Sequence, residues 1–246
     1  MIRIFAPILL AWAAALPLHA ADRTPQVHLA GDSTMANYPA ENPLRGWGMA
    51  LGRHFVDPAM VHNDAISGRS TKSFIERGDW GKLLAALQPG DFVIIQFGHN
   101  DEKVDKPMTG TDVATVFPDN LRRMVRDVRS KQAVPLLATP VARRKFDRDG
   151  KLVPTHGAYP DASRAVAGEL DVPLLDLERA TSAWLQREGV EASQQYFAGF
   201  TSVGQPPVSP SAPDNTHFID LGAQRVAELA VMEIRALKLP LVRWLK

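Results

Sequence analysis

The sequence predicts an α/β fold with a central five-stranded parallel sheet and helices on both faces of the sheet, and two patterns support it. Short apolar runs alternate five times with amphipathic stretches, which is typical of a parallel sheet with right-handed crossovers and helices on both faces. The clearest run, residues 92–97, is continuous and rich in β-branched residues, as expected of a strand buried on both faces. No internal repeat or linker divides the sequence, so we expect one domain.

Each strand is predicted from a short apolar run that ends in turn-forming residues. In chain order these runs span residues 27–30, 60–66, 92–97, 134–138 and 172–175. Each helix is predicted from apolar residues that recur three and four positions apart. In chain order these stretches span residues 46–55, 73–87, 112–131, 159–170, 177–188 and 219–237. Gly78 is expected to break the second of them.

Three segments carry neither pattern. Residues 143–157 are polar and loop-like, and residues 199–213 hold four prolines, which favour an irregular loop. The tail, residues 239–246, is apolar with basic residues. We expect the tail to pack on the body of the domain, with a surface or membrane contact as the alternative.

The composition excludes several classes of protein. The 246 residues include 28 Lys and Arg and 27 Asp and Glu, a formal net charge of +1. A nucleic-acid binder would need a stronger basic field, so we expect no nucleic-acid partner. Cysteine is absent, which excludes disulfides, thiolate metal sites and a cysteine nucleophile.

The first 20 residues have the pattern of a secretory signal peptide. Arg3 is their only charge, an apolar run covers residues 4–18, and small residues precede Asp22, as at a cleavage site. The run is short for a membrane anchor and contains two prolines. We therefore predict removal of residues 1–20, a mature domain over residues 22–246, a periplasmic or extracellular location, and no stable membrane insertion.

Small, polar and ionisable residues follow the first three predicted strands, at the edge where open parallel sheets bind their ligands, and a similar group precedes the last predicted helix. They form four blocks, Gly31-Asp32-Ser33-Thr34, Gly68-Arg69-Ser70, Gly98-His99-Asn100-Asp101 and Asp214-Asn215-Thr216-His217. All four should face the same rim. The chain lacks the G-x-S-x-G nucleophile elbow of α/β-hydrolases and the H-E-x-x-H zinc motif.

These four blocks resemble the SGNH hydrolases, also called the GDSL esterases and lipases, and the resemblance covers the whole mature chain. The resemblance implies a flavodoxin-like fold, a three-layer α/β/α sandwich around the five-stranded parallel sheet. It also implies a serine hydrolase with Ser33 as nucleophile, His217 as general base and Asp214 as the carboxylate that orients the histidine. It also implies an oxyanion hole formed by the backbone N–H groups of Ser33 and Gly68 and the side-chain amide of Asn100.

The residue types suit this chemistry. A serine hydroxyl is a poor nucleophile until a base takes its proton, and histidine, with a reference pKa of about 6.5, can accept and return a proton near neutrality. Asp214 and His217 are three residues apart, which lets the carboxylate accept Nδ1–H and leaves Nε2 for Ser33. The triad and the oxyanion donors suffice for acyl transfer, so we expect no metal and no cofactor.

Each of these residues has a structural alternative, as a turn, capping or core residue. Two neighbouring aspartates, Asp32 and Asp101, are expected to bind loop N–H groups rather than to take part in the reaction. His28, His54 and His62 lie within or beside packed elements and are expected to be structural as well.

Within the family, the wider context most resembles rhamnogalacturonan acetylesterases, which implies an acetylated pectic polysaccharide or oligosaccharide as the substrate. The supporting segments include Gly46-Trp47-Gly48 and residues 139–144. Six side chains are candidates for sugar or carboxylate contacts, namely Trp47, Arg69, His99, Arg143, His156 and Tyr159. Core packing is the alternative for Trp47, and His99 is equally suited to supporting its turn.

Three other functions stay open. The first is an esterase, lipase or thioesterase with another acyl preference, and the second is a transferase that passes acetyl to a sugar instead of water. The third is a secreted carbohydrate-binding protein without activity. A broken triad would be expected of that third class, whereas Ser33, Asp214 and His217 are all present.

Overall fold

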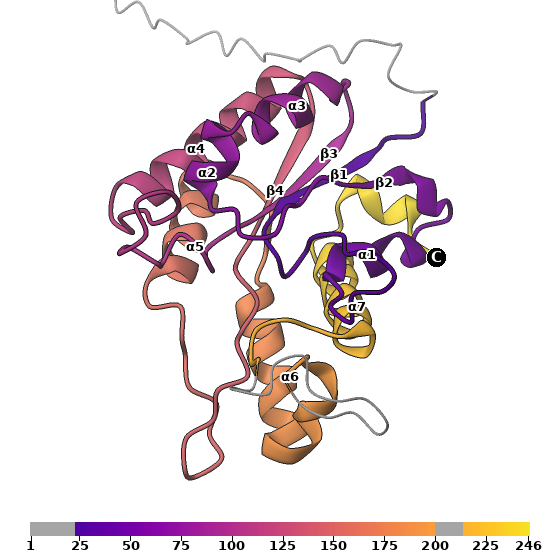
Figure 1. Cartoon of the computed structure of the whole chain (residues 1–246). Coiled ribbons are helices and arrows are strands. Elements are labelled where there is room, and N and C mark those ends of the chain that lie inside the picture. Colours follow the sequence, from indigo (N-terminus) through magenta and orange to yellow (C-terminus); the bar gives the residue numbers. More distant parts are fainter. Residues whose placement is uncertain (1–22, 200–213) are drawn as a thin grey trace, which may run out of the picture.

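A computed structural model of the chain describes residues 23–199 and 214–246 (Figure 1). The predicted signal peptide, residues 1–20, lies outside the described residues, as does nearly all of the predicted proline-rich loop 199–213. Within the described residues, no helix has both the length and the apolar character needed to cross a bilayer.

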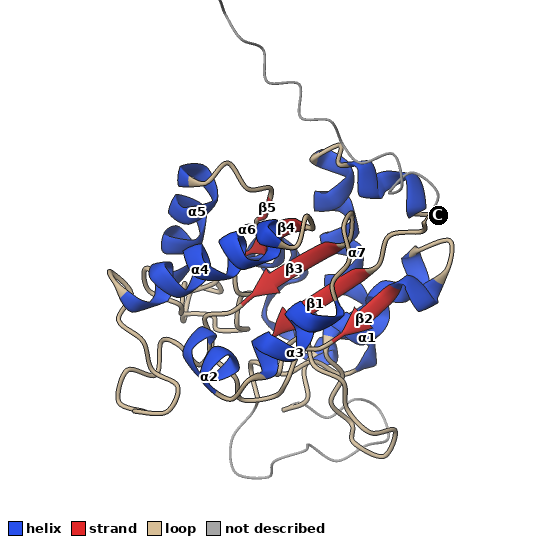
Figure 2. Ribbon diagram, turned by 90° about the horizontal axis from the view of Figure 1, so that it is seen from above, coloured by secondary structure: helices blue, strands red, loops and turns tan. Residues whose placement is uncertain are grey.

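The described chain forms the five-stranded parallel sheet that the sequence predicts (Figure 2). The strands are β1 (Val27–Gly31), β2 (Val61–Asn63), β3 (Phe92–Gln96), β4 (Val134–Ala138) and β5 (Leu174–Leu175). Their order is β2-β1-β3-β4-β5, and every neighbouring pair is parallel. The strand order reverses at β1, because β2 lies on one side of it and β3 on the other. Ligands of open α/β sheets bind at such a switch point, beyond the carboxyl ends of the strands.

Helices cover both faces of the sheet, because successive strand residues point to opposite sides. One face packs against α1 (Trp47–Leu51), α6 (Leu177–Ala192) and α7 (Asp220–Ala236). The other face packs against α2 (Thr71–Glu76), α3 (Asp79–Ala86), α4 (Val116–Ser130) and α5 (Tyr159–Glu169). On β3, Ile94 belongs to the first core and Val93 and Ile95 to the second. Two separate cores therefore enclose the strands, as in a three-layer sandwich.

Most differences from the predicted boundaries have local causes. The predicted helix 112–131 begins only at Val116, because one carboxylate oxygen of Asp112 accepts the N–H groups of Ala114 and Thr115, which forms a turn first. The helix predicted over residues 73–87 is broken where expected, at Gly78, whose φ of 81° is left-handed. Strands β2 and β5 are shorter than predicted, since they are the edges of the sheet.

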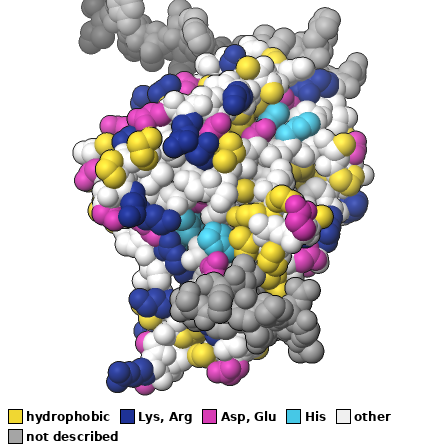
Figure 3. All heavy atoms as spheres, in the orientation of Figure 1, with side chains coloured by type: hydrophobic (Ala, Val, Ile, Leu, Met, Phe, Trp, Pro, Cys, Tyr) yellow, Lys and Arg dark blue, Asp and Glu magenta, His cyan; other side chains and the backbone are white. Residues whose placement is uncertain are grey.

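The tail packs on the body of the domain, as expected. Residues 240–244 form a short 3-10 helix, the side chains of Leu241 and Leu245 are buried in the first core, and Leu245 bridges to Phe55. On the face drawn in Figure 3, acidic and basic side chains are interspersed, and neither sign forms a continuous patch.

Gly46 lies at the start of α1, where the backbone passes very close to the loop after β1. A Cβ on Gly46 would lie 2.2 Å from the carbonyl oxygen of Ala36 and 2.3 Å from the carbonyl carbon of Met35. One residue later, the N–H of Trp47 donates to the carbonyl of Thr34 at 2.9 Å. This close approach fixes the loop after β1 against α1.

We expect Gly46→Ala to lower the free energy of unfolding by about 1–3 kcal/mol, because the new methyl overlaps backbone atoms that cannot give way. The matched control is Gly81→Ala in the interior of α3, where a Cβ would meet no atom within 4 Å. That change should raise the free energy of unfolding by about 0.5–1 kcal/mol, the usual gain from replacing a helical glycine. Urea unfolding measures both variants, and a Gly46→Ala protein as stable as Gly81→Ala would contradict the packing described.

Candidate active site

His217 lies within hydrogen-bonding distance of both Ser33 and Asp214, although 184 positions separate the serine from the histidine. Ser33 follows β1, whereas the other two lie in the segment before α7. The Nε2 atom of His217 is 2.9 Å from the Ser33 hydroxyl, and Nδ1 is 2.7 Å from Oδ2 of Asp214. The structure thus brings together the three residues predicted as a triad.

The Asp214 carboxylate orients the histidine through several contacts. Its Oδ1 atom accepts the N–H groups of Thr216 and His217, each at 2.9 Å, while Oδ2 contacts the ring. Burial tends to raise the pKa of Asp214, but hydrogen bonds from the His217 ring and backbone hold this pKa below its usual range. An ionised carboxylate selects the tautomer with hydrogen on Nδ1, so the Nε2 lone pair faces the serine hydroxyl.

Neighbouring segments anchor the loop that carries the histidine. The carbonyl of His217 accepts the N–H of Ala198 at 3.0 Å, and the carbonyl of Asn215 accepts the N–H of Arg144 at 2.9 Å. Arg144 belongs to the loop that follows β4. These hydrogen bonds therefore hold His217 at the same edge of the sheet as Ser33.

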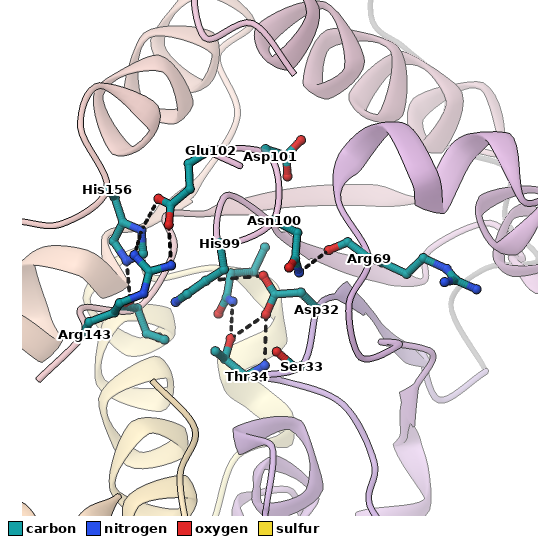
Figure 4. A network of polar contacts seen from close by, with 12 residues as sticks. Asp32, Ser33, Thr34, Arg69, His99, Asn100, Asp101, Glu102, Arg143 and His156 are labelled. Atoms are coloured by element: carbon teal, nitrogen blue, oxygen red, sulfur yellow. Dashed lines mark hydrogen bonds and ion pairs between the residues drawn. The ribbon is translucent and has the colours of Figure 1, made fainter. Parts of the chain in front are cut away.

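The peptide group between Ser33 and Thr34 is held at both of its ends. The Tyr38 hydroxyl donates to the carbonyl of Ser33 at 2.9 Å. Oδ1 of Asp32 accepts the N–H of Thr34 at 2.9 Å and the Thr34 hydroxyl at 2.8 Å (Figure 4). The side chain of Gln96, from β3, donates to the same hydroxyl oxygen at 2.9 Å. These bonds fix the turn that presents the serine.

Tyr38 is a site residue that the sequence reasoning missed. Its half-buried ring places the hydroxyl on the Ser33 backbone, and burial raises the pKa of that hydroxyl. No motif includes Tyr38, and the sequence offers only the cue of an aromatic residue five positions after Ser33.

The two other predicted oxyanion donors lie in neighbouring loops. Gly68 has a φ of 78°, a left-handed conformation that favours glycine, and no atom lies within 4 Å of its missing Cβ. Asn100 lies four residues after the end of β3. Its Nδ2 donates to the carbonyl of Arg69 at 2.9 Å, and its Oδ1 accepts a hydrogen bond from Lys103 Nζ at 2.8 Å. The Asn100 amide is thus fixed beside the segment that contains Gly68. The role of Gly68 and Asn100 as oxyanion donors stays a prediction.

Two of the predicted substrate contacts are wrong, because both side chains are buried and satisfied inside the protein. Trp47 is completely buried, and its Nε1–H donates to Gln96 Oε1 at 2.8 Å. The Tyr159 hydroxyl donates to the carbonyl of Thr111 at 2.6 Å, and its ring is 6% exposed. Neither side chain presents a surface on which a sugar could stack.

The other four candidate residues contact neighbouring side chains within the protein. His99 and His156 are buried next to each other, and Arg143 pairs with Glu102 (Figure 4). Arg69 pairs with Asp79 at 2.7 Å and keeps 20% of its side chain exposed. The two arginines therefore stay candidates for substrate contacts, whereas the two histidines lie behind the surface.

The aspartates expected to be structural hold loops, as predicted. Asp101 accepts the N–H of Thr71 at 3.1 Å and the hydroxyl groups of Thr71 and Thr111 at 2.5 and 3.1 Å. Burial raises the pKa of Asp101 to about 7 despite these donors. Within the described ranges, no group of three or more acidic, histidine or cysteine side chains is arranged to hold a metal ion.

Comparisons with known proteins point to one family. The GDSL-like lipase/acylhydrolase family matches residues 29–225. The chain is 41% identical to the rhamnogalacturonan acetylesterase RhgT of Bacillus subtilis, over 88% of this chain and 92% of that protein. It is 35% identical to the probable rhamnogalacturonan acetylesterase YesY of the same organism, over 87% of this chain and 94% of that protein.

Solved structures share the fold. The Bacillus subtilis protein YxiM superposes with a TM-score of 0.75 and 27% identity, covering 89% of this chain, and the chain spans only 58% of that structure. A catalytic mutant of Axe2, an acetylxylan esterase from Geobacillus stearothermophilus, superposes with a TM-score of 0.58 and 18% identity, covering 85% of this chain and 94% of that one.

We expect a fluorophosphonate probe to label Ser33 covalently, because a hydroxyl 2.9 Å from an oriented imidazole is an activated nucleophile. Peptide mass spectrometry locates the label. Ser33→Ala should abolish it, and Ser130→Ala, at the exposed end of α4, should leave it unchanged. Labelling of another serine with Ser33 unmodified would contradict the assignment.

Asp214→Asn should slow this labelling about 10³- to 10⁴-fold, because an amide no longer favours the tautomer that leaves Nε2 free. In the unchanged protein, the pKa of Asp214 lies below its usual range, so this carboxylate stays ionised at pH 5 to 8. Protonation of Asp214 should therefore have no effect on the labelling rate in this range. Equal rates for the two proteins would contradict this role of Asp214.

Proposed function

Since the chain belongs to the GDSL-like lipase/acylhydrolase family, we propose that it is a secreted serine esterase. Its proposed reaction is the removal of O-acetyl groups from a plant cell-wall polysaccharide, with rhamnogalacturonan as the best candidate. Two relatives that are 41% and 35% identical over most of the chain are named as acetylesterases of this polymer. The observation that carries the proposal is the contact of 2.9 Å between His217 Nε2 and the Ser33 hydroxyl. A serine activated by a neighbouring histidine can hydrolyse an ester, and ester hydrolysis is the activity for which these two relatives are named.

In the proposed reaction, the Ser33 oxygen attacks the acetyl carbonyl carbon while His217 takes the hydroxyl proton. The carbonyl oxygen gains the negative charge, and the N–H groups of Ser33 and Gly68 with the Asn100 amide stabilise it. Collapse of this intermediate breaks the bond to the sugar oxygen, which leaves with the proton from His217. Water then attacks the acetyl-serine with His217 as base again, and acetate and the free serine are released.

The surface chemistry favours local recognition of the polymer. Charges of both signs are mixed on the face shown in Figure 3, and the formal net charge is only +1. A long-range field that attracts an acidic polymer is therefore absent on that face. Secretion, which the first 20 residues predict, would place the enzyme where such a polymer is accessible.

We expect the purified protein to release acetate from acetylated rhamnogalacturonan faster than from acetylated xylan at equal acetyl content. It should also hydrolyse an aryl acetate faster than the aryl butyrate or octanoate. Ser33→Ala is the blank, and its turnover should fall about 10⁶-fold, as when the nucleophile of a triad is removed. Acetate release is measured by an enzyme-coupled assay.

Each proposal has its own contradicting outcome in this assay. A preference for xylan would overturn the choice of polymer, and a preference for octanoate would overturn the acetylesterase. Transfer of acetyl to an added sugar acceptor in place of acetate release would identify a transferase. Unchanged turnover by a folded Ser33→Ala protein would overturn the serine mechanism.

A further inference from the structure

The side chain of Asn100 has two partners whose chemistry fixes the orientation of its amide. Its Nδ2 donates to the carbonyl of Arg69 at 2.9 Å (Figure 4), and its Oδ1 accepts a hydrogen bond from Lys103 Nζ at 2.8 Å. A carbonyl oxygen can only accept a hydrogen bond, and a lysine ammonium can only donate one. Exchanging the oxygen and the nitrogen of the amide would break both bonds, so the two partners select one orientation.

This orientation leaves one hydrogen of Nδ2 for a further acceptor. An amide nitrogen carries two hydrogens, and the carbonyl of Arg69 takes one of them. Within the described residues, no second acceptor contacts Nδ2. Asn100 is 6% exposed, and a buried donor without a partner costs free energy. The second hydrogen is therefore suited to an oxygen that arrives with the substrate, as the oxyanion role predicted for Asn100 requires.

The ammonium of Lys103 also strengthens the amide as a donor. A positive charge at the amide oxygen draws electron density away from the nitrogen, because hydrogen bonds in a chain polarise one another. The two carboxylates that flank Lys103 most closely in the sequence, those of Glu102 and Asp105, pair with other cations. The Lys103 ammonium is thus directed at the amide of Asn100 and not at a neighbouring carboxylate.

The backbone of Lys103 is held in place by its own loop. Its N–H donates to the carbonyl of Asn100 at 3.3 Å, and its carbonyl accepts the N–H of Lys106 at 2.8 Å. The returning arm of the loop packs against it, since a Cβ on Gly110 would lie 2.4 Å from the Lys103 carbonyl oxygen. Although the side chain of Lys103 is exposed, it therefore starts from a fixed point three residues after the amide that it contacts.

We propose that Lys103 is a positioning residue that fixes and polarises the Asn100 amide as an oxyanion donor. A donor that is already aligned and strengthened stabilises the charge that develops on the carbonyl oxygen without reorganisation during the reaction. Lys103 acts only through Asn100, by the contact of 2.8 Å between Nζ and Oδ1. The proposal rests on the proposed function, in which Asn100 stabilises the oxyanion.

Lys103→Met tests this role, because methionine keeps an unbranched side chain and lacks the ammonium. We expect kcat for an aryl acetate to fall about 5- to 10-fold, as when a charge-assisted hydrogen bond is lost at an exposed position. KM should stay unchanged, because the charge on the carbonyl oxygen develops only in the transition state. Lys103→Arg keeps a cationic donor and should recover most of the lost kcat, which a general loss of stability would not do.

Lys106→Met is the matched control. Lys106 is exposed on the same loop, and its ammonium pairs with Asp105 at 3.5 Å rather than with the amide of Asn100. The control removes the same charge from the same loop, so kcat and KM should equal those of the unchanged protein. A loss of kcat in Lys106→Met as large as in Lys103→Met would reflect the charge of the loop as a whole and would overturn the proposal.

A double variant with Asn100→Ala separates this proposal from the proposed function. Asn100→Ala alone should lower kcat about 10²- to 10³-fold, the cost of one oxyanion donor. Adding Lys103→Met should lower kcat no further, because the lysine then has no amide to act on.

Two outcomes of this cycle would overturn the positioning role and leave the proposed function standing. One is an unchanged kcat in Lys103→Met while Asn100→Ala is impaired, and the other is a further loss of about 5- to 10-fold in the double variant, equal to the loss from Lys103→Met alone. Turnover that persists in Ser33→Ala would overturn the proposed function instead.

Discussion

The site depends on one peptide group, the one between Ser33 and Thr34, which is immobilised at both ends. Tyr38 binds its carbonyl oxygen, and the Asp32 carboxylate binds its N–H. A nucleophile must be held in a fixed position relative to its base, because a misplacement of about 1 Å can slow the reaction about 10²-fold. Because this peptide is rigid, the contact of 2.9 Å between Ser33 and His217 is built into the fold and needs no rearrangement.

The parallel sheet explains why residues from distant parts of the chain meet at this peptide. The switch in strand order at β1 places the ends of β1 and β3 side by side, so the turn of Ser33 and the loop of Asn100 share one edge. Gln96 at the end of β3 links the two by its bond to the Thr34 hydroxyl. Helix α7 begins three residues after His217, and its packing on the first core brings the base to the same edge.

Much of this could be predicted because short sequence patterns carry it. Periodicity located every strand and α-helix of the described chain, and the four blocks of polar residues named the residues that the structure brings together. Trp47 and Tyr159 were misjudged because an aromatic residue near a functional block suits a sugar platform and a core position equally. Only burial separates these two roles, and burial depends on contacts between distant segments. The contact of Tyr38 with the Ser33 backbone and the contacts among His156, Glu102 and Arg143 could not be predicted for the same reason.

The central claim, that Ser33 carries the acyl group during turnover, can be tested most directly by trapping that intermediate. The protein is mixed with an excess of aryl acetate, quenched with acid during steady-state turnover, digested and analysed by peptide mass spectrometry. We predict that the peptide containing Ser33 carries an acetyl group on that serine. In the control, where the protein is quenched with acid before the substrate is added, the same peptide should carry no acetyl group. Continued turnover with acetyl on a different residue, or turnover that persists when Ser33 is alanine, would contradict it.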